Sequence, residues 1–142
     1  MAQLYFRYST MNAGKSIDLI KVAHNYEERG KRVLVFTSAK DTRSEHGKIQ
    51  SRIGMSRDAI VIDEETDILK IVMLENMRQI VDCVLVDEAQ FLSRHHVEEL
   101  VEIVDSLECP VICYGLKNDF KNDLFEGSYY LLGTQLPDAY GG

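Results

Sequence analysis

The sequence predicts an α/β domain in which helices cover both faces of a parallel sheet. Short apolar runs alternate with longer stretches of helical period, which is the order typical of βαβ units. Two of the runs, at residues 33–36 and 84–86, are apolar at every position, as strands covered on both faces must be. The length of 142 residues suits one compact domain and is too short for two.

Taken in order, strands are predicted at residues 4–8, 33–37, 83–86 and 111–114, and helices at residues 16–29, 66–77 and 96–107. Gly30 follows the first helix where a C-cap glycine belongs, and Asp63 and Thr66 are N-cap candidates for the second. The charged stretch at residues 38–55 has little periodicity and is predicted to be a long loop. Residues 133–142 have no periodicity either, and we expect an irregular tail there.

Acidic residues dominate the charge, with 23 Asp and Glu against 16 Lys and Arg and a net charge of −7. This balance argues against binding to a nucleic-acid polymer or an anionic membrane surface, so a phosphate ligand needs a local positive site. Because no signal peptide and no apolar stretch of about 20 residues is present, we predict a cytoplasmic protein. The three cysteines (Cys83, Cys109 and Cys113) form no Cys-x-x-Cys pair and are predicted to be buried thiols.

A phosphate-binding sequence follows the first predicted strand. It matches G-x-x-x-x-G-K-[ST] except that Ser9 replaces the first glycine. Successive backbone N–H groups of such a turn, with the positive end of the next helix, hold a polyphosphate. Lys15 would reach the β- and γ-phosphates and the Ser16 hydroxyl would bind Mg²⁺. The residues predicted to contact the nucleotide here are Ser9, Thr10, Met11, Asn12, Ala13, Gly14, Lys15 and Ser16.

This motif makes the predicted fold class a P-loop NTPase of RecA-like type. The simpler alternative is a strand-to-helix turn in which Ser16 only caps the helix.

Two acids, Asp87 and Glu88, directly follow the apolar run that ends at Val86. Ligands of parallel α/β sheets bind at the carboxyl ends of strands, so these acids should lie beside the phosphate loop. Asp87 would hold the magnesium, and Glu88 would take a proton from an attacking hydroxyl or water. The plain alternative is a solvated start of the next helix. Together the two motifs predict a Mg·ATP site without separating a kinase from an ATPase.

Five ordered motifs resemble the type II thymidine kinases of bacteria and animals. They are TMNAGKS at residues 10–16, DTR at 41–43, SRIGM at 51–55, DEAQF at 87–91, and YGLKNDF at 114–120 with FEGS at 125–128. The match covers residues 1–132 in order, which indicates a nucleotide-binding kinase core over this segment.

The resemblance implies transfer of the γ-phosphoryl group of ATP to the 5′-hydroxyl of deoxythymidine. It implies that Lys15 and Ser16 hold the triphosphate and magnesium, that Asp87 supports the metal, that Glu88 is the base, and that Arg43 clamps a phosphate. It further implies a homotetramer and an apolar nucleoside pocket, for whose members core packing is the alternative. The pocket residues are Met11, Phe91, Leu116, Phe120 and Phe125.

Members of that family continue with a zinc-binding lobe and a loop over the thymine, for which this sequence has no matching residues. We therefore predict no zinc site in this chain and expect a shortened relative. Two rival functions stay open: an ATP-binding module without turnover, and an ATPase in which Glu88 activates water. His95 and His96 are expected to face different directions and share no metal, and residues 63–65 are expected to be helix N-terminal charges.

Overall fold

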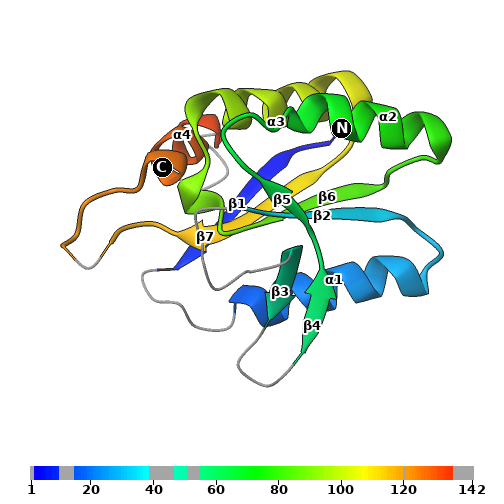
Figure 1. The fold of residues 1–142 in the computed structure, drawn as a ribbon, viewed down its shortest axis with the longest axis horizontal. Coiled ribbons are helices and arrows are strands. Elements are labelled where there is room, and N and C mark those ends of the chain that lie inside the picture. The colour runs from blue at the N-terminus through cyan, green and yellow to red at the C-terminus, as the bar shows by residue number, and fades with distance from the viewer. Residues whose placement is uncertain (1, 10–14, 39–46, 51–54, 120, 136–142) are drawn as a thin grey trace.

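The computed structural model describes residues 2–9, 15–38, 47–50, 55–119 and 121–135, and its centre is a five-stranded sheet (Figure 1). The order across the sheet is β1 (Leu4–Ser9), β7 (Val111–Leu116), β6 (Cys83–Asp87), β2 (Val33–Ser38) and β5 (Ile60–Ile62). Each strand runs parallel to its neighbours. The predicted α/β class with a parallel sheet is therefore confirmed.

Helices cover both faces of this sheet, as Figure 1 shows. One face carries α1 (Lys15–Glu28) and a small antiparallel pair, β3 (Lys48–Gln50) and β4 (Ser56–Asp58). The other carries α2 (Ile68–Arg78), α3 (Arg94–Leu107) and α4 (Glu126–Thr134).

Side chains of β6 alternate between two apolar cores. Val84 and Val86 pack into the core under α2 and α3, whereas Cys83 and Leu85 pack into the core under α1. All four are buried. Covering on both sides explains why this strand is apolar at every position.

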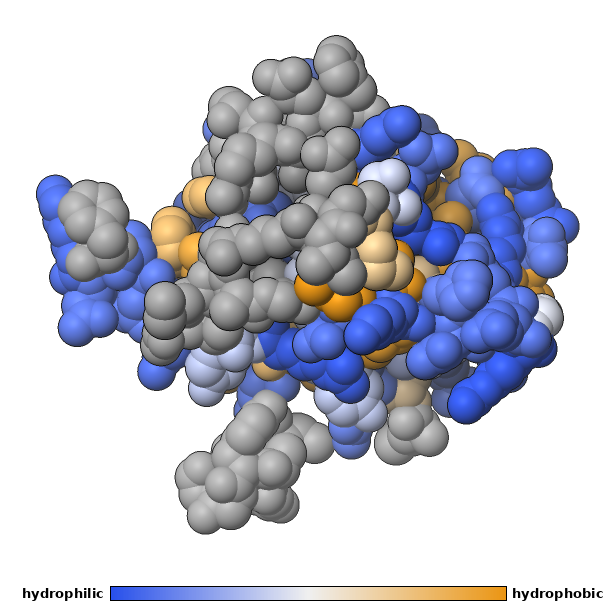
Figure 2. Space-filling view, turned by 90° about the horizontal axis from the view of Figure 1, so that it is seen from below, coloured by the Kyte–Doolittle hydropathy of each residue, from blue (hydrophilic) through white to orange (hydrophobic). Residues whose placement is uncertain are grey.

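The outer surface is mainly hydrophilic where α1, β3 and β4 face the viewer in Figure 2. Within the described ranges, no helix is long and apolar enough to cross a membrane. The three cysteines are free and buried, as predicted. Burial raises the pKa of Cys83 to about 11 and that of Cys109 to about 12, so these thiols are not reactive nucleophiles at neutral pH.

The end of α1 agrees with the sequence. Gly30 has a φ of 74°, the left-handed conformation that glycine adopts without steric cost. The amide of Lys31 donates to the carbonyl of Tyr26 at 3.0 Å, and that of Gly30 to Glu27 at 3.0 Å. These bonds satisfy carbonyls that the helix end leaves free.

Some elements lie where the sequence predicted none. The loop predicted over residues 38–55 is wrong at its start, where Ser38 belongs to β2, and at residues 48–50, which form β3. β3, β4 and β5 have 3 residues each, too few for a period to show. Nor was α4 predicted, because two glycines and two tyrosines make its sequence a weak helix former.

The boundary of the tail was predicted after residue 132. α4 continues through Thr134, and the side-chain amide of Gln135 donates to the Leu4 carbonyl of β1 at 3.2 Å. Residues 136–142 lie outside the described residues. The division of the chain into core and tail stays a prediction.

The N-cap predicted for α2 is wrong, because Asp67 caps this helix. Its carboxylate accepts a hydrogen bond from the amide of Lys70 at 2.9 Å. Asp63 and Thr66 bond each other instead, with 2.9 Å between the threonine hydroxyl and the carboxylate. The acids at residues 63–65 therefore precede the helix in a turn of their own.

The expectation that His95 and His96 face different directions is also wrong. Their ring centroids lie 4.0 Å apart, and each Nδ1 lies within 2.9 Å of the Ser93 hydroxyl. Both rings fold back over the N-cap because they lie in the first turn of α3. In the ranges that the structure describes, no cluster of three or more metal-binding side chains occurs.

The His96 ring also fixes its own tautomer. Its Nε2 lies 3.2 Å from the Thr66 carbonyl, so this nitrogen must carry the proton. Its Nδ1 then accepts from the Ser93 amide at 3.4 Å, as the glutamate of a capping box does. Protonated His96 could not keep that bond.

A short 3-10 helix, η2 (Ala89–Phe91), joins β6 to α3 and packs against α4. A Cβ on Gly127 of α4 would lie 2.2 Å from the Ala89 carbonyl oxygen and 2.9 Å from that of Gln90. The backbones approach this closely only because residue 127 is glycine.

We expect Gly127→Ala to lower the free energy of unfolding by about 1–3 kcal/mol, the usual range for overpacking a filled site. Gly133→Ala in the same helix is the matched control, because among the described residues nothing beyond the neighbouring turns of α4 lies within 4 Å of the added carbon. Alanine there should stabilise by about 0.5–1 kcal/mol through helix propensity. Urea unfolding of both variants measures the contrast, and equal effects would contradict the close approach.

We expect acid to destabilise the fold through His96. Burial, followed by the neighbouring His95 ring, lowers the pKa of His96 from its usual 6.5, so the unfolded chain binds this proton more readily than the folded one. The free energy of unfolding should therefore fall as pH drops below about 6.5, until the lower folded pKa is passed. Urea unfolding between about pH 7.5 and pH 5 measures this loss.

His96→Gln can still accept a hydrogen bond from the Ser93 amide. It should lower the dependence of the free energy of unfolding on pH below about 6.5. His24→Gln, at an exposed position of α1, is the control and should keep the slope. An unchanged slope in His96→Gln would assign the acid sensitivity to other groups.

Candidate functional site

The carboxyl ends of four neighbouring strands meet at one edge of the sheet. In the strand register, Ser9 of β1 lies beside Leu116 of β7, and Asp87 of β6 lies beside Thr37 of β2. Parallel α/β sheets bind ligands outside this edge. The edge is therefore where the predicted site residues should meet.

The predicted phosphate loop connects β1 to α1. Ser9 closes the strand and Lys15 opens the helix, which is the strand–turn–helix order that the motif requires. The residues between them, Thr10, Met11, Asn12, Ala13 and Gly14, lie outside the described residues, and so do the side chains of Ser9 and Lys15. Arg43 and Phe120 lie outside them as well.

Ser16 and Asp87 meet across the sheet edge. The Ser16 hydroxyl donates to Oδ2 of Asp87 at 3.3 Å, although 71 positions separate them in the sequence. Asp87 is buried, and its Oδ1 accepts the backbone amide of Glu88 at 2.9 Å. A hydroxyl and a carboxylate are hard oxygen ligands of the kind that Mg²⁺ takes beside nucleotide phosphates. This pair fits the predicted metal-binding role.

Glu88 is buried directly after β6, in an uncommon backbone conformation. Its φ of 56° and ψ of 39° lie in the left-handed region, which costs a residue with a Cβ about 1–2 kcal/mol. Observed strain of this kind concentrates at functional sites.

Gln90 is a site residue that the sequence analysis missed. Its Nε2 donates to Oε2 of Glu88 at 2.8 Å, and its Oε1 accepts the amide of Leu116 at 3.1 Å. The side chain is buried. A glutamine between Ala89 and Phe91 could have been noticed, because a polar group in an apolar segment must find partners inside the fold.

Two of the predicted nucleoside-pocket residues form an aromatic pair. The rings of Phe91 and Phe125 lie edge to face, with centroids 5.6 Å apart and an interplanar angle of 82°. Leu116 is half-buried at the end of β7. Phe91 also lines a cavity of about 500 Å³ together with Ser38 and His95.

The segment from Lys117 to Phe125 returns the chain to this edge. Asn118 and Leu124 form an antiparallel bridge, and Oδ1 of Asp119 accepts the amides of Lys121 and Asp123 at 2.8 and 3.0 Å. The Phe125 amide donates to the Lys117 carbonyl at 3.2 Å. The polar residues after Gly115 therefore build a turn that positions Phe125.

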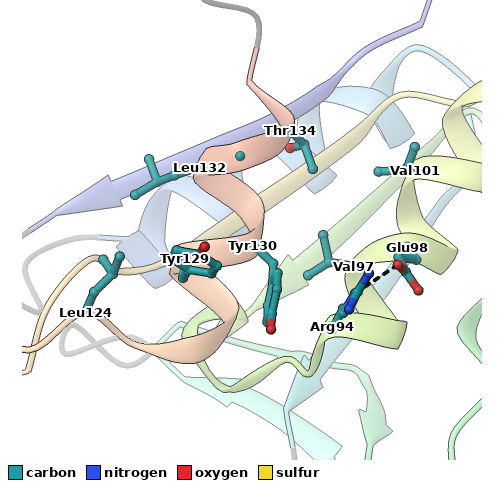
Figure 3. Close-up of a pocket in the computed structure, with 10 residues that line it drawn as sticks. Arg94, Val97, Glu98, Val101, Leu124, Tyr129, Tyr130, Leu132 and Thr134 are labelled. Carbon is teal, nitrogen blue, oxygen red and sulfur yellow. Dashed lines mark hydrogen bonds and ion pairs between the residues drawn. The ribbon is translucent and has the colours of Figure 1, made fainter.

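A larger cavity of about 650 Å³ lies between α3 and α4 (Figure 3). Val97, Tyr130 and Leu132 line it, and the Arg94–Glu98 ion pair borders it at 3.2 Å. None of the predicted site residues that the structure describes lines it. Size alone therefore does not identify the site.

A family model and several known proteins match most of this chain. A family model described as thymidine kinase matches residues 2–135. The thymidine kinase of Streptococcus gordonii is 57% identical over 132 residues, which cover 93% of this chain and 68% of that protein. Those of Enterococcus faecalis, at 56% identity, and Listeria monocytogenes, at 57%, match over 132 residues as well, or 67% and 68% of their lengths. The predicted resemblance is confirmed.

The backbone conformation of Glu88 gives a stability prediction that does not depend on any catalytic role of this residue. Glu88→Gly should be more stable than Glu88→Ala by about 1–2 kcal/mol, because both lose the carboxylate and only alanine keeps a Cβ in the left-handed region. The same pair of substitutions at Glu98, inside α3, should give the opposite order, with alanine favoured by about 1 kcal/mol. Thermal or urea unfolding of the four variants decides it, and alanine favoured at both positions would contradict the strain.

Proposed function

Because the chain belongs to the thymidine kinase family, we propose that it transfers the γ-phosphoryl group of ATP to the 5′-hydroxyl of deoxythymidine. One observation carries this proposal. The buried pair Asp87 and Glu88 ends β6, and Asp87 bonds Ser16 in the first turn of the helix that follows the phosphate loop. A hydroxyl for the metal, a carboxylate for the metal and a second carboxylate for a proton thus lie at one edge.

We assign the triphosphate to the turn between β1 and α1. The backbone amides from Ser9 to Ser16 and the amino end of α1 would bind its oxygens, and Lys15 would contact the β- and γ-phosphates. Arg43 is assigned to the phosphate side by the family resemblance. Ser16 and Asp87 would hold Mg²⁺, which neutralises charge on the phosphate oxygens when bound.

Glu88 is assigned as the base. Its carboxylate would accept the proton of the 5′-hydroxyl while the hydroxyl oxygen bonds to the γ-phosphorus and the bond to ADP breaks. Asp87 accepts hydrogen bonds from the Ser16 hydroxyl and the Glu88 amide. These bonds support different roles for the two acids, with Asp87 at the metal and Glu88 as the base.

We assign the nucleoside to the part of this sheet edge where Phe91 and Phe125 lie. The paired rings of Phe91 and Phe125 would contact a planar base and Leu116 would add apolar contact, with Met11 and Phe120 completing the predicted pocket. The homotetramer implied by the resemblance stays a prediction.

The test is to incubate the full chain with Mg·ATP, with and without thymidine, and to measure thymidine monophosphate and free phosphate. Formation of the monophosphate supports the proposal. Phosphate release that does not depend on thymidine would favour an ATPase, and ATP binding without either product would favour a non-catalytic ATP-binding module.

We expect Glu88→Gln to lower kcat by about 10²–10⁴-fold, the usual contribution of a general base, with ATP affinity nearly unchanged. Lys15→Ala is the companion variant and should lose ATP binding, because the phosphates lose the cation of the loop. Stopped-flow nucleotide binding and steady-state kinetics separate the two effects. Loss of ATP binding in Glu88→Gln would show that Glu88 serves the metal or the fold instead.

A further inference from the structure

The amide of Gln90 joins two parts of the site. Its Nε2 lies 2.8 Å from Oε2 of Glu88, and its Oε1 lies 3.1 Å from the backbone nitrogen of Leu116. Only 2% of the residue is exposed to solvent, so both bonds form in the interior. Bonds of this kind are stronger there than in water.

The two partners also fix which way the amide points. The backbone N–H of Leu116 can only donate, so the oxygen of Gln90 must face it. The NH₂ group must then face Glu88, whose ionised carboxylate can only accept. The orientation therefore follows from the network, and it supplies Glu88 with a donor.

The surrounding backbone leaves this amide little freedom. A Cβ on Gly115 would lie 2.6 Å from Oε1 of Gln90 and 3.0 Å from its backbone nitrogen. On the other side, a Cβ on Gly127 would lie 2.9 Å from the Gln90 carbonyl carbon. Two positions without side chains therefore enclose Gln90, one on β7 and one on α4.

We infer that Gln90 is a positioning residue, which holds the Glu88 carboxylate in its reactive orientation and couples it to the end of β7 at Leu116. This inference rests on the proposed function, in which Glu88 is the base. The coupling matters because Leu116 belongs to the predicted nucleoside pocket, so one amide links the base to the place where the acceptor binds.

Gln90→Met tests this, because methionine has a similar length and adapts to fill the same space without a donor. Steady-state kinetics, with kcat expressed per ATP-binding site, separate an effect on the reaction from a loss of folded enzyme. In kinetics we expect kcat at neutral pH to fall about tenfold or more, with the KM for ATP within about threefold of the parent.

Gln90→Glu is the second variant, in case the first does not fold. It keeps an acceptor for the Leu116 amide but replaces the donor to Glu88 with an oxygen. We expect kcat per ATP-binding site to fall about tenfold or more in this variant as well.

Ser128→Ala is the matched control. The buried Ser128 hydroxyl donates to the carbonyl of Leu116, so its loss loosens the same end of β7 while Gln90 keeps its bond to Glu88. We expect this variant to lose stability and to keep kcat per ATP-binding site within about threefold of the parent.

Two results would overturn the inference: the parent kcat in both Gln90 variants, or an equal loss of kcat per ATP-binding site in Ser128→Ala. The proposed function fails differently, since Glu88→Gln would then keep the parent kcat.

Discussion

Two carboxylates lie buried at the end of β6, and burying a charge costs several kcal/mol unless the protein supplies hydrogen-bond donors. Asp87 receives the hydroxyl of Ser16 from α1 and the amide of Glu88, while Glu88 receives the side-chain amide of Gln90 from η2. Throughout the described residues, no buried side-chain nitrogen or oxygen lacks a hydrogen-bond partner. The need to solvate these two acids from within the protein therefore brings α1, β6 and η2 together.

The hydrogen bond to Glu88 also places demands on the backbone conformation around it. The donor to Glu88 comes from a 3-10 helix of 3 residues, and Glu88 directly before it adopts the left-handed conformation. η2 can lie close to β7 and α4 because Gly115 and Gly127 have no side chain. The glycines of the YGL and FEGS motifs thus have a packing reason, which is connected through η2 to the electrostatics of the carboxylates.

The parts of the fold that the sequence predicted are those with a repeated local signal. β2 and β6 are apolar at every position because both faces are covered, and the phosphate-loop pattern fixes the order of strand, turn and helix. The missed parts depend on single long-range contacts. β3 is a strand of 3 residues whose central Ile49 is 1% exposed, and Gln90 became visible as a site residue only when Leu116, 26 positions away, was found beside it. The cap of α2 at Asp67 and the folding of His95 toward Ser93 likewise depend on side-chain conformation, which local pattern does not determine.

Leu116 joins the two functions of this edge in one residue. Its amide holds Gln90, its carbonyl accepts the Ser128 hydroxyl, and its side chain belongs to the predicted nucleoside pocket. A change in pocket shape that shifts this end of β7 would also shift the amide that faces Glu88, because that amide accepts the Leu116 N–H and Gln90 packs closely against Gly115 and Gly127. The shape of the nucleoside pocket and the orientation of the Glu88 carboxylate are therefore coupled in this fold. Selection for a differently shaped acceptor would have to act on η2 and the glycines around it as well as on the residues that contact the base of the nucleoside.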